Sequence, residues 1–393
     1  MKRYLIFVII AILLSGCGTS DYSSILRASI SKDPSAAFKV LAKNKSIQYA
    51  ANPSRLSSDI KNLDKNIFSA LLAMFKEASK SWGEENTKVP NKKEYVKYMQ
   101  NYKSRALVDF DKGLVTVETL DSANSKKSLK NAIVTTLLLP DDPRSADLFG
   151  AKEIKLGETP YLLGEVKDDQ NKDIRYSWRA SRYADILLAK DYKVKNIVRD
   201  SKNVKVHYVT MPMVKDHSDV RVAKFIPHVK KYAKQFNVSE NLIYAIMQTE
   251  SNFNQYAVSG AGAFGLMQIV PSSAGKDAYK LVKGKSGTPT KSYLFNAKNN
   301  IELGVAYINI LNNRYLPGIN NPVSKEYCVI SAYNTGSGNV LKTFHSNRSK
   351  AKDKINSQTA SMVYKKLRSD LPYEETRRYL KKVVDYKKNF VNL

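Results

Sequence analysis

The hydrophobic pattern of this chain changes once, near residue 214, and this change limits the possible folds more than any other feature. Before it, apolar residues recur with period two in some segments and with the helical period in others. After VKVHYVTMPMV (204–214) only the helical period remains, and the polar cluster at 215–219 marks a domain boundary. The pattern therefore predicts an α+β chain, with a mixed α/β N-terminal domain at 56–214 and a mainly α-helical domain at 215–393.

Several segments have the period of a single type of element. The run RALVDFDKGLVTVETL (105–120) predicts a hairpin, in which Gly113 supplies the positive φ that its turn requires. Apolar spacing predicts helices at about 56–80, 126–138 and 181–190, and strands at about 152–156, 160–166 and 204–214. The second half should begin with a helix at about 219–236, with Pro227 bending it or lying in its first turn, and a second helix from about 240 to 251 or 252.

The first seventeen residues, MKRYLIFVIIAILLSGC, have the layout of an export signal. Two cations precede ten apolar residues, a run too short to span a bilayer comfortably. The segment Leu-Ser-Gly-Cys that ends at Cys17 resembles the lipobox of bacterial lipoproteins, in which the cysteine is lipidated and becomes the mature N-terminus. We therefore expect a signal peptide at 1–16, then a lipidated tether at 17–55. An ordinary signal peptide with a chance cysteine is the alternative.

Gly18 follows this cysteine, at the position where an aspartate commonly signals retention in the inner membrane of enteric bacteria. The sequence therefore favours an outer-membrane lipoprotein that faces the periplasm. The formal charge of +28 should attract such a chain to polyanions. Glycan strands of the cell wall and anionic lipid head groups are then better partners than nucleic acid. A lysine-rich surface that is simply solvated is the alternative reading of the charge.

We expect no metal and no cofactor. The second cysteine, Cys328, lies in the apolar stretch EYCVISAY and is most simply a small buried hydrophobe. The four histidines are scattered, and no pair has the spacing of a zinc site. Gly260, Gly262 and Gly265 have the spacing of a dinucleotide fingerprint, but a helix end precedes them and the position twenty residues on is lysine, so we reject a nucleotide site.

The stretch LIYAIMQTESNF (242–253) places a glutamate where a carboxylate is unusual. In a helix, Glu250 lies three, four and seven positions after Met247, Ile246 and Ile243, on the apolar face. Partial burial and the negative end of the helix dipole both oppose ionisation there. A carboxylic acid that stays protonated is suited to general acid catalysis. A glutamate paired with a buried arginine, or frayed into water at the helix end, is the alternative.

Three later segments carry groups suited to binding a sugar polymer. SGAGAFGLMQIVP predicts a glycine-rich loop or hairpin that approaches a glycan closely, with Gln268 offering its amide. SAYNTGSGNV places Tyr333 and Asn334 at the end of an apolar helix. PYEETRRYLKKV places Glu375 and Tyr379 on a basic helix.

Together these segments resemble the four ordered motifs of the family 1 lytic transglycosylases. The matching runs are Glu250–Phe253, Gly262–Pro271, Ala332–Gly336 and Glu375–Leu380. The resemblance implies a catalytic domain similar to goose-type lysozyme over about 219–390. The first half, in SWGEE, KEYVKYMQNYKSR, FDKGLVTVET and SWRASRYADILL, resembles the N-terminal part of a membrane-bound member of that family. Val270 and Leu380 stand where the family often has methionine and valine, which affects packing more than chemistry.

The resemblance implies an enzyme that cleaves peptidoglycan between N-acetylmuramic acid and N-acetylglucosamine and leaves a 1,6-anhydro ring. Glu250 corresponds to the sole catalytic acid of that family. Ser259, Gln268, Tyr333 and Glu375 match positions that line the glycan cleft, and Asn334 is a lesser candidate for orienting the sugar.

Two other functions remain open from the sequence. A lysozyme-like muramidase would cut the same bond with water, and only its products would differ. A non-catalytic peptidoglycan-binding lipoprotein could hold the anionic wall by charge, since 14 basic and 5 acidic residues lie between Lys342 and Leu393. The N-terminal domain shows no chemistry of its own, and we expect Trp82 and Trp178 in a core or an interface.

Overall fold

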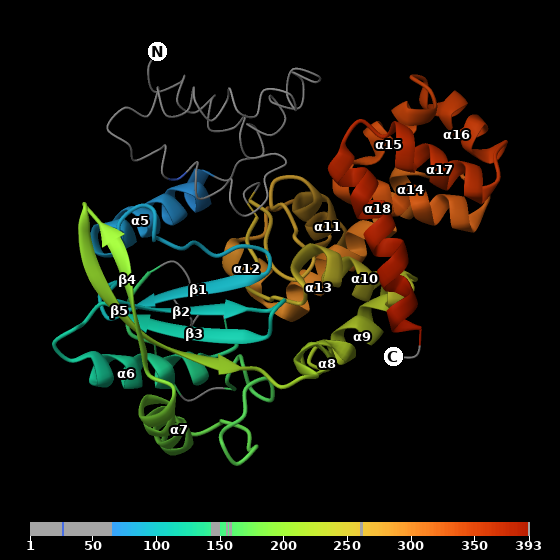
Figure 1. The fold of residues 1–393 in the computed structure, drawn as a ribbon. Helices are drawn as coiled ribbons and strands as arrows, with labels where there is room; N and C mark the ends of the chain where they lie inside the picture. Colours follow the sequence, from blue (N-terminus) through green and yellow to red (C-terminus); the bar gives the residue numbers. More distant parts are fainter. Residues whose placement is uncertain are drawn as a thin grey trace. The chain divides into compact units, whose positions relative to one another are not determined.

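A computed structural model of the chain describes residues 65–142, 150–154, 156, 159–259 and 262–391, together with Leu26. Contacts divide the chain into two compact units. The first comprises the chain up to Lys224 and the segment Asn254–Gly265, and the second comprises Phe225–Phe253 and Leu266–Leu393. The first unit contains an antiparallel sheet, and the regular elements described in the second unit are all helices, which confirms the predicted α+β class (Figure 1).

The first unit is built on a five-stranded antiparallel sheet in the order β1-β2-β3-β5-β4. Its strands are β1 (Glu94–Met99), β2 (Ser104–Asp109), β3 (Leu114–Thr119), β4 (Lys193–Arg199) and β5 (Lys202–Pro212). β2 and β3 form the hairpin predicted at 105–120, and Gly113 in its turn has a φ of 64°. β3 also pairs with β5, so the chain between them is an insertion that returns to the same sheet.

Among the described residues of this unit, four helices accompany the sheet: α5 (Lys65–Trp82), α6 (Ser125–Leu137), α7 (Ser177–Lys190) and α8 (His217–Ala223). Figure 1 shows α6 along one face of the sheet, and it contacts β2, β3 and α7. α6 buries Leu129, Ala132 and Ile133 on its inner side. The helices predicted at 126–138 and 181–190 are therefore confirmed, although α7 begins four residues earlier than expected.

Two predicted strands are wrong, and two real strands escaped prediction. Residues 152–154 and 156 have no regular secondary structure, and residues 160–166 form turns and isolated bridges, because no neighbouring strand pairs with them. β1 is buried along nearly its whole length, so its sequence lacks the alternation of a half-exposed strand. β4 is mostly exposed and therefore has no apolar side to reveal it.

The single helix predicted at 219–236 is two helices, α8 and α9 (Ile226–Phe236). Pro227 lies in the first turn of α9, where a missing N–H costs no hydrogen bond. α8 belongs to the first unit, because Arg221 and Lys224 pair with the buried carboxylate of Glu165 at 2.7 and 2.6 Å. Contacts thus divide the chain after Lys224, whereas the division at residue 215 came from composition and stays a prediction.

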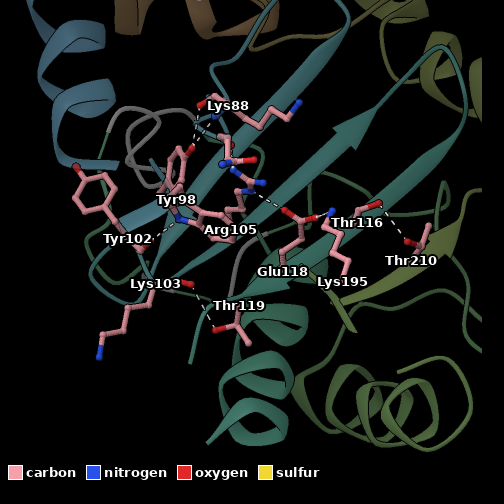
Figure 2. A network of polar contacts seen from close by, with 12 residues as sticks. Lys88, Tyr98, Tyr102, Lys103, Arg105, Thr116, Glu118, Thr119, Lys195 and Thr210 are labelled. Atoms are coloured by element: carbon pink, nitrogen blue, oxygen red, sulfur yellow. Dashed lines mark hydrogen bonds and ion pairs between the residues drawn. The ribbon is translucent and has the colours of Figure 1, made fainter. Parts of the chain in front are cut away.

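A buried ion network joins three strands of the sheet (Figure 2). The carboxylate of Glu118 on β3 accepts hydrogen bonds from Arg105 on β2 at 2.6 Å and from Lys195 on β4 at 2.5 Å. The guanidinium of Arg105 also lies 3.7 Å from the ring centroid of Trp82. Burial alone would raise the pKa of Glu118, but the two cations outweigh it and hold the pKa below its ordinary value.

The second unit is a bundle of helices around α10. Its helices are α9, α10 (Glu240–Ser251), α11 (Ala274–Lys283), α12 (Lys291–Phe295), α13 (Ala297–Ile310), the π-helix η2 (Leu311–Tyr315), α14 (Pro322–Thr335), α15 (Ser337–Phe344), α16 (Arg348–Asn356), α17 (Ala360–Asp370), α18 (Glu374–Lys387) and the 3₁₀ turn η3 (Lys388–Phe390). α10 packs against α9 and α18, and its bounds confirm the helix predicted from about 240 to 251.

Within the part of the chain that the structure describes, no helix is both long and apolar enough to cross a membrane. The predicted signal peptide, Cys17 and the tether at 17–55 lie outside the described residues apart from Leu26.

Replacing the central carboxylate of the ion network tests its contribution to stability. Glu118→Gln should lower the free energy of unfolding by about 3–5 kcal/mol, because Arg105 would remain charged and buried without its partner. Chemical denaturation followed by the fluorescence of Trp82 measures this loss. Glu77→Gln is the matched control, since the Glu77–Lys80 pair has side chains 46% and 62% exposed and should contribute within about 0.5 kcal/mol. Equal losses from the two substitutions would show that the buried ion network contributes no more to stability than an exposed ion pair.

Candidate active site

Helix α10 carries Glu250 in its last turn, facing inward. The side chains of Ile243, Ile246 and Met247 on the same face are 0% exposed, and Glu250 itself is 5% exposed. The prediction that this glutamate lies on an apolar face is therefore confirmed. The helix ends directly after it, with Asn252 and Phe253 at φ values of 50° and 59°. These left-handed residues turn the chain away from the helix axis and leave the carboxyl group at the helix terminus.

A short loop, Leu266–Ile269, is held beside the end of α10 by side chains from three helices. The Ser251 hydroxyl, one residue after Glu250, donates to the carbonyl of Leu266 at 2.8 Å. The Tyr333 hydroxyl on α14 donates to the carbonyl of Met267 at 2.8 Å. The backbone N–H of Met267 donates to the amide oxygen of Asn300 on α13 at 2.8 Å. Three successive backbone groups are thereby fixed relative to Glu250.

Gln268 lies in this loop and adopts a φ of 48°. For a residue with a side chain this left-handed conformation is uncommon and persists only where the surroundings enforce it. Gln268 is 8% exposed, and its neighbour Met267 packs against Gly304 of α13. The loop therefore presents the Gln268 amide from a rigid backbone.

Two phenols lie within the electrostatic range of Glu250. Burial raises the pKa of Tyr333 well above its ordinary value, and the nearby Glu250 carboxylate raises it further. The same two causes, in the same order, raise the pKa of Tyr379 on α18. Both hydroxyls therefore stay protonated at any physiological pH, and both can donate hydrogen bonds. Glu250, Tyr333 and Tyr379 come together from α10, α14 and α18.

Asn334 and Glu375 lie at the contact between α14 and α18. The amide oxygen of Asn334 accepts a hydrogen bond from the Thr376 hydroxyl at 2.6 Å. This bond sets the start of α18 against the end of α14 and thereby helps to place Tyr379. Glu375 precedes Thr376 in the first turn of α18 and is exposed, so its carboxylate can meet a ligand from solvent.

Ser259 belongs to the segment Asn254–Gly265, which contacts assign to the first unit. Its backbone N–H donates to the carbonyl of Ala263 at 3.0 Å, and its hydroxyl accepts from the N–H of Ala263 at 3.1 Å. Val258 and Phe264, which precede Ser259 and follow Ala263, form an antiparallel bridge. The structure thus brings Glu250, Gln268, Tyr333, Asn334 and Glu375 into one unit, and Ser259 stands in the other.

Ser251 and Asn300 were not among the predicted site residues. Ser251 forms part of the quoted Glu-Ser-Asn-Phe run, but nothing in a sequence distinguishes a hydroxyl that binds a distant carbonyl from one that faces water. Asn300 is 0% exposed in the apolar helix α13, and an asparagine inside such a run was the available signal. Within the described residues, no group of three or more His, Cys, Asp or Glu could hold a metal ion.

Comparison with known proteins gives matches to two family models. Residues 59–224 match the N-terminal domain of membrane-bound lytic murein transglycosylase C, and residues 227–356 match the transglycosylase SLT domain. Proteins described as membrane-bound lytic murein transglycosylase C from Yersinia pestis (strain Pestoides F) and Yersinia pseudotuberculosis serotype O:1b (strain IP 31758) are each 42% identical over 346 residues. These alignments cover 88% of this chain and 95% of each relative.

Two solved structures also match. One is an inactive mutant of the lytic transglycosylase Slt from Pseudomonas aeruginosa, with 27% identity and a TM-score of 0.31 over 41% of this chain and 23% of that chain. The other is the 70 kDa soluble lytic transglycosylase from Escherichia coli, with 25% identity and a TM-score of 0.33 over 42% of this chain and 23% of that one.

The fold, the buried glutamate and the two family models define a modular lytic transglycosylase. The identity and coverage of the Yersinia relatives go further, because they extend through both units. The chain belongs to the membrane-bound lytic murein transglycosylase C family.

Adding a methyl group at Gly304 tests how strictly the Gln268 loop is positioned. A Cβ there would lie 2.3 Å from the sulfur and 2.8 Å from the Cβ of Met267, so the loop must move. Gly304→Ala should cost about 1–3 kcal/mol of stability, measured by chemical denaturation, and should reduce activity. Gly338→Ala, in α15 with nothing within 4 Å, is the control and should be neutral or up to about 1 kcal/mol more stable. If Gly304→Ala changed neither stability nor activity, the Gln268 loop would be free to shift.

Proposed function

We propose that this chain is a peptidoglycan lytic transglycosylase in which Glu250 is the sole catalytic acid and base. The observation that carries this assignment is the buried carboxyl group at the end of α10, beside two phenols that burial keeps protonated. Family membership supplies the substrate class, since the relatives are described as murein transglycosylases. The site supplies a mechanism that needs one carboxyl group only.

In the first step, protonated Glu250 donates its proton to the oxygen that joins N-acetylmuramic acid to N-acetylglucosamine. The bond from C1 to that oxygen breaks, and the N-acetyl oxygen of the same muramic acid stabilises the positive charge that develops at C1. In the second step, the Glu250 carboxylate accepts the proton of the C6 hydroxyl while the C6 oxygen bonds to C1. Glu250 is then protonated again, the product carries a 1,6-anhydro ring, and no water is consumed. Most glycosidases instead need a second carboxylate for water or as a nucleophile.

The remaining predicted site residues have roles that follow from their positions. Gln268 offers an amide to ring substituents from a fixed loop. Tyr333 donates its hydrogen to Met267, which leaves the phenolic oxygen as an acceptor for a substrate N–H or O–H. Asn334 acts through Thr376 as a positioning residue. Glu375 and Ser259 are proposed to contact the glycan. Glu375 is exposed and Ser259 is half-buried, so a ligand can reach both.

Glu250→Gln tests the catalytic assignment. Glutamine has nearly the same shape, so the variant should fold normally but cleave roughly 10² to 10⁴-fold more slowly, the scale of a lost general acid. Mass spectrometry of muropeptides released from purified peptidoglycan measures the rate and identifies the product ends. Glu240→Gln, in the first turn of the same helix, is the matched control and should retain full activity.

The products also separate the competing functions. Ends in 1,6-anhydro-N-acetylmuramic acid support transglycosylation, whereas reducing ends would identify a hydrolytic muramidase. Near-normal cleavage by Glu250→Gln would overturn the role of this residue. Binding to peptidoglycan without any release, by the unaltered chain as well, would identify a non-catalytic wall-binding lipoprotein.

We propose further that the chain is anchored by lipid at Cys17 to the outer membrane, on its periplasmic face. The membrane-bound designation of the relatives supports membrane association, and the lipobox-like segment supports this form of anchor.

Cys17→Ala should move the chain from the membrane fraction to the soluble periplasmic fraction, because no acyl chain could be attached. Fractionation and immunoblotting measure the shift, with Cys328→Ala as the control because Cys328 is buried in the fold. Retention of Cys17→Ala with the membrane would contradict lipid anchoring at this residue.

A further inference from the structure

Two large aromatic side chains of the first unit face solvent at the start of α7. Tyr176 and Trp178 are 59% and 58% exposed, although both are residues that proteins usually cover. The other tryptophan of the chain, Trp82, is 0% exposed and donates its indole N–H to the carbonyl of Tyr102 at 2.7 Å. The exposure of Trp178 is therefore a local feature that the core does not explain.

The backbone beneath these aromatics is held by a buried carboxylate. Asp168, whose side chain is 0% exposed, accepts hydrogen bonds from the N–H groups of Gln170 and Lys172 and from Arg179 and Arg182 of α7. Lys167 and Asp173 close the turn through a bridge. One carboxylate thus ties the 167–173 turn to the first turns of α7, and Tyr176 and Trp178 lie between these two attachments. Their backbone positions are fixed before any ligand arrives, which lowers the entropy lost on binding.

Trp178 also has one neighbour that orients its ring. The guanidinium of Arg179 lies 4.6 Å from the ring centroid, while Arg179 is itself held by Asp168. We call Tyr176, Trp178 and the 167–173 turn the aromatic platform. Such a rigid aromatic surface with hydrogen-bonding groups beside it is the usual composition of a ligand site.

The residues around the aromatics select the kind of ligand. Asp169, Gln170, Asn171 and Asp173 are all exposed in the 167–173 turn, where Asp169 pairs with Arg182 at 2.7 Å. A bilayer would have to desolvate these groups, which costs free energy unless they find new partners. A sugar ring presents apolar C–H groups on its face and hydroxyl and amide groups at its rim. The C–H face can cover an aromatic ring while amides and carboxylates bind the rim.

We propose that the aromatic platform is a second, non-catalytic glycan site, which binds N-acetylated pyranose rings of a peptidoglycan strand. This inference rests on the proposed function for the identity of the polymer. Arg175, which is exposed beside Tyr176, adds a cation suited to the carboxylates of muramic acid and its peptides. The site gives the first unit a binding role that its sequence did not reveal.

The test uses the full chain that begins after Cys17, with Glu250→Gln to prevent turnover. Peptide-free glycan strands prepared from peptidoglycan are titrated while tryptophan emission and its quenching by acrylamide are recorded. Trp82 is buried, so a saturable change reports Trp178. We expect protection of Trp178 from acrylamide. Tyr176→Ala should raise the midpoint of the titration roughly 5- to 30-fold, the range for losing an aromatic contact at the centre of a binding surface.

Val198→Ala is the matched control, because Val198 is a 63% exposed apolar residue of β4 in the same unit, and its midpoint should stay unchanged. If glycan changed neither the emission of Trp178 nor its quenching by acrylamide, the proposed glycan site would be wrong. The same conclusion would follow if Tyr176→Ala left the midpoint of the titration unchanged. A response to vesicles of phosphatidylethanolamine and phosphatidylglycerol but not to glycan would overturn the glycan site in favour of a membrane contact.

Release of 1,6-anhydro products by the unaltered chain is measured separately. Its absence would overturn the proposed function, while a glycan response of Trp178 would still support the platform.

Discussion

The loop Leu266–Ile269 is fixed by hydrogen bonds to side chains of three helices, and the geometry around Glu250 depends on them. Buried backbone groups must find partners, and here Ser251, Asn300 and Tyr333 provide them from three different helices. Losing one partner would leave a buried polar group unsatisfied, at a cost of about 1–3 kcal/mol. Because each bond comes from a different helix, the loop also fixes α10, α13 and α14 relative to one another.

The neighbours of Glu250 differ in charge from those of Glu118, another buried glutamate. A cation beside a glutamate favours the ionised form, as Arg105 and Lys195 do for Glu118 in the first unit. Tyr333 and Tyr379 bring no charge to Glu250, because burial keeps both phenols protonated. The two units therefore contain buried glutamates in opposite surroundings, one suited to holding strands together and the other to moving a proton.

The sequence predicted those features that depend on local spacing. The helix of Glu250, the 105–120 hairpin and the inward face of α10 all follow from periodicity, and the structure confirms them. β1 and β4 were missed because one is buried almost throughout and the other is largely exposed, so neither alternates. The roles of Ser251 and Asn300 depend on partners 15 and 33 residues away, and no spacing rule connects such pairs. The aromatic platform was hidden for a related reason, since Trp178 was expected in a core or an interface and only the fold shows that it faces solvent.

The segment Asn254–Gly265 has a consequence for the order in which the protein is made. Its residues complete the core of the first unit: Asn254 is 0% exposed and accepts a hydrogen bond from Tyr161, and Tyr256 donates to the carbonyl of Pro140. Asn254 follows Tyr161 by 93 residues and comes after the whole of α10. When the chain emerges with its N-terminus first, the sheet unit therefore cannot complete its core until α10 has emerged as well.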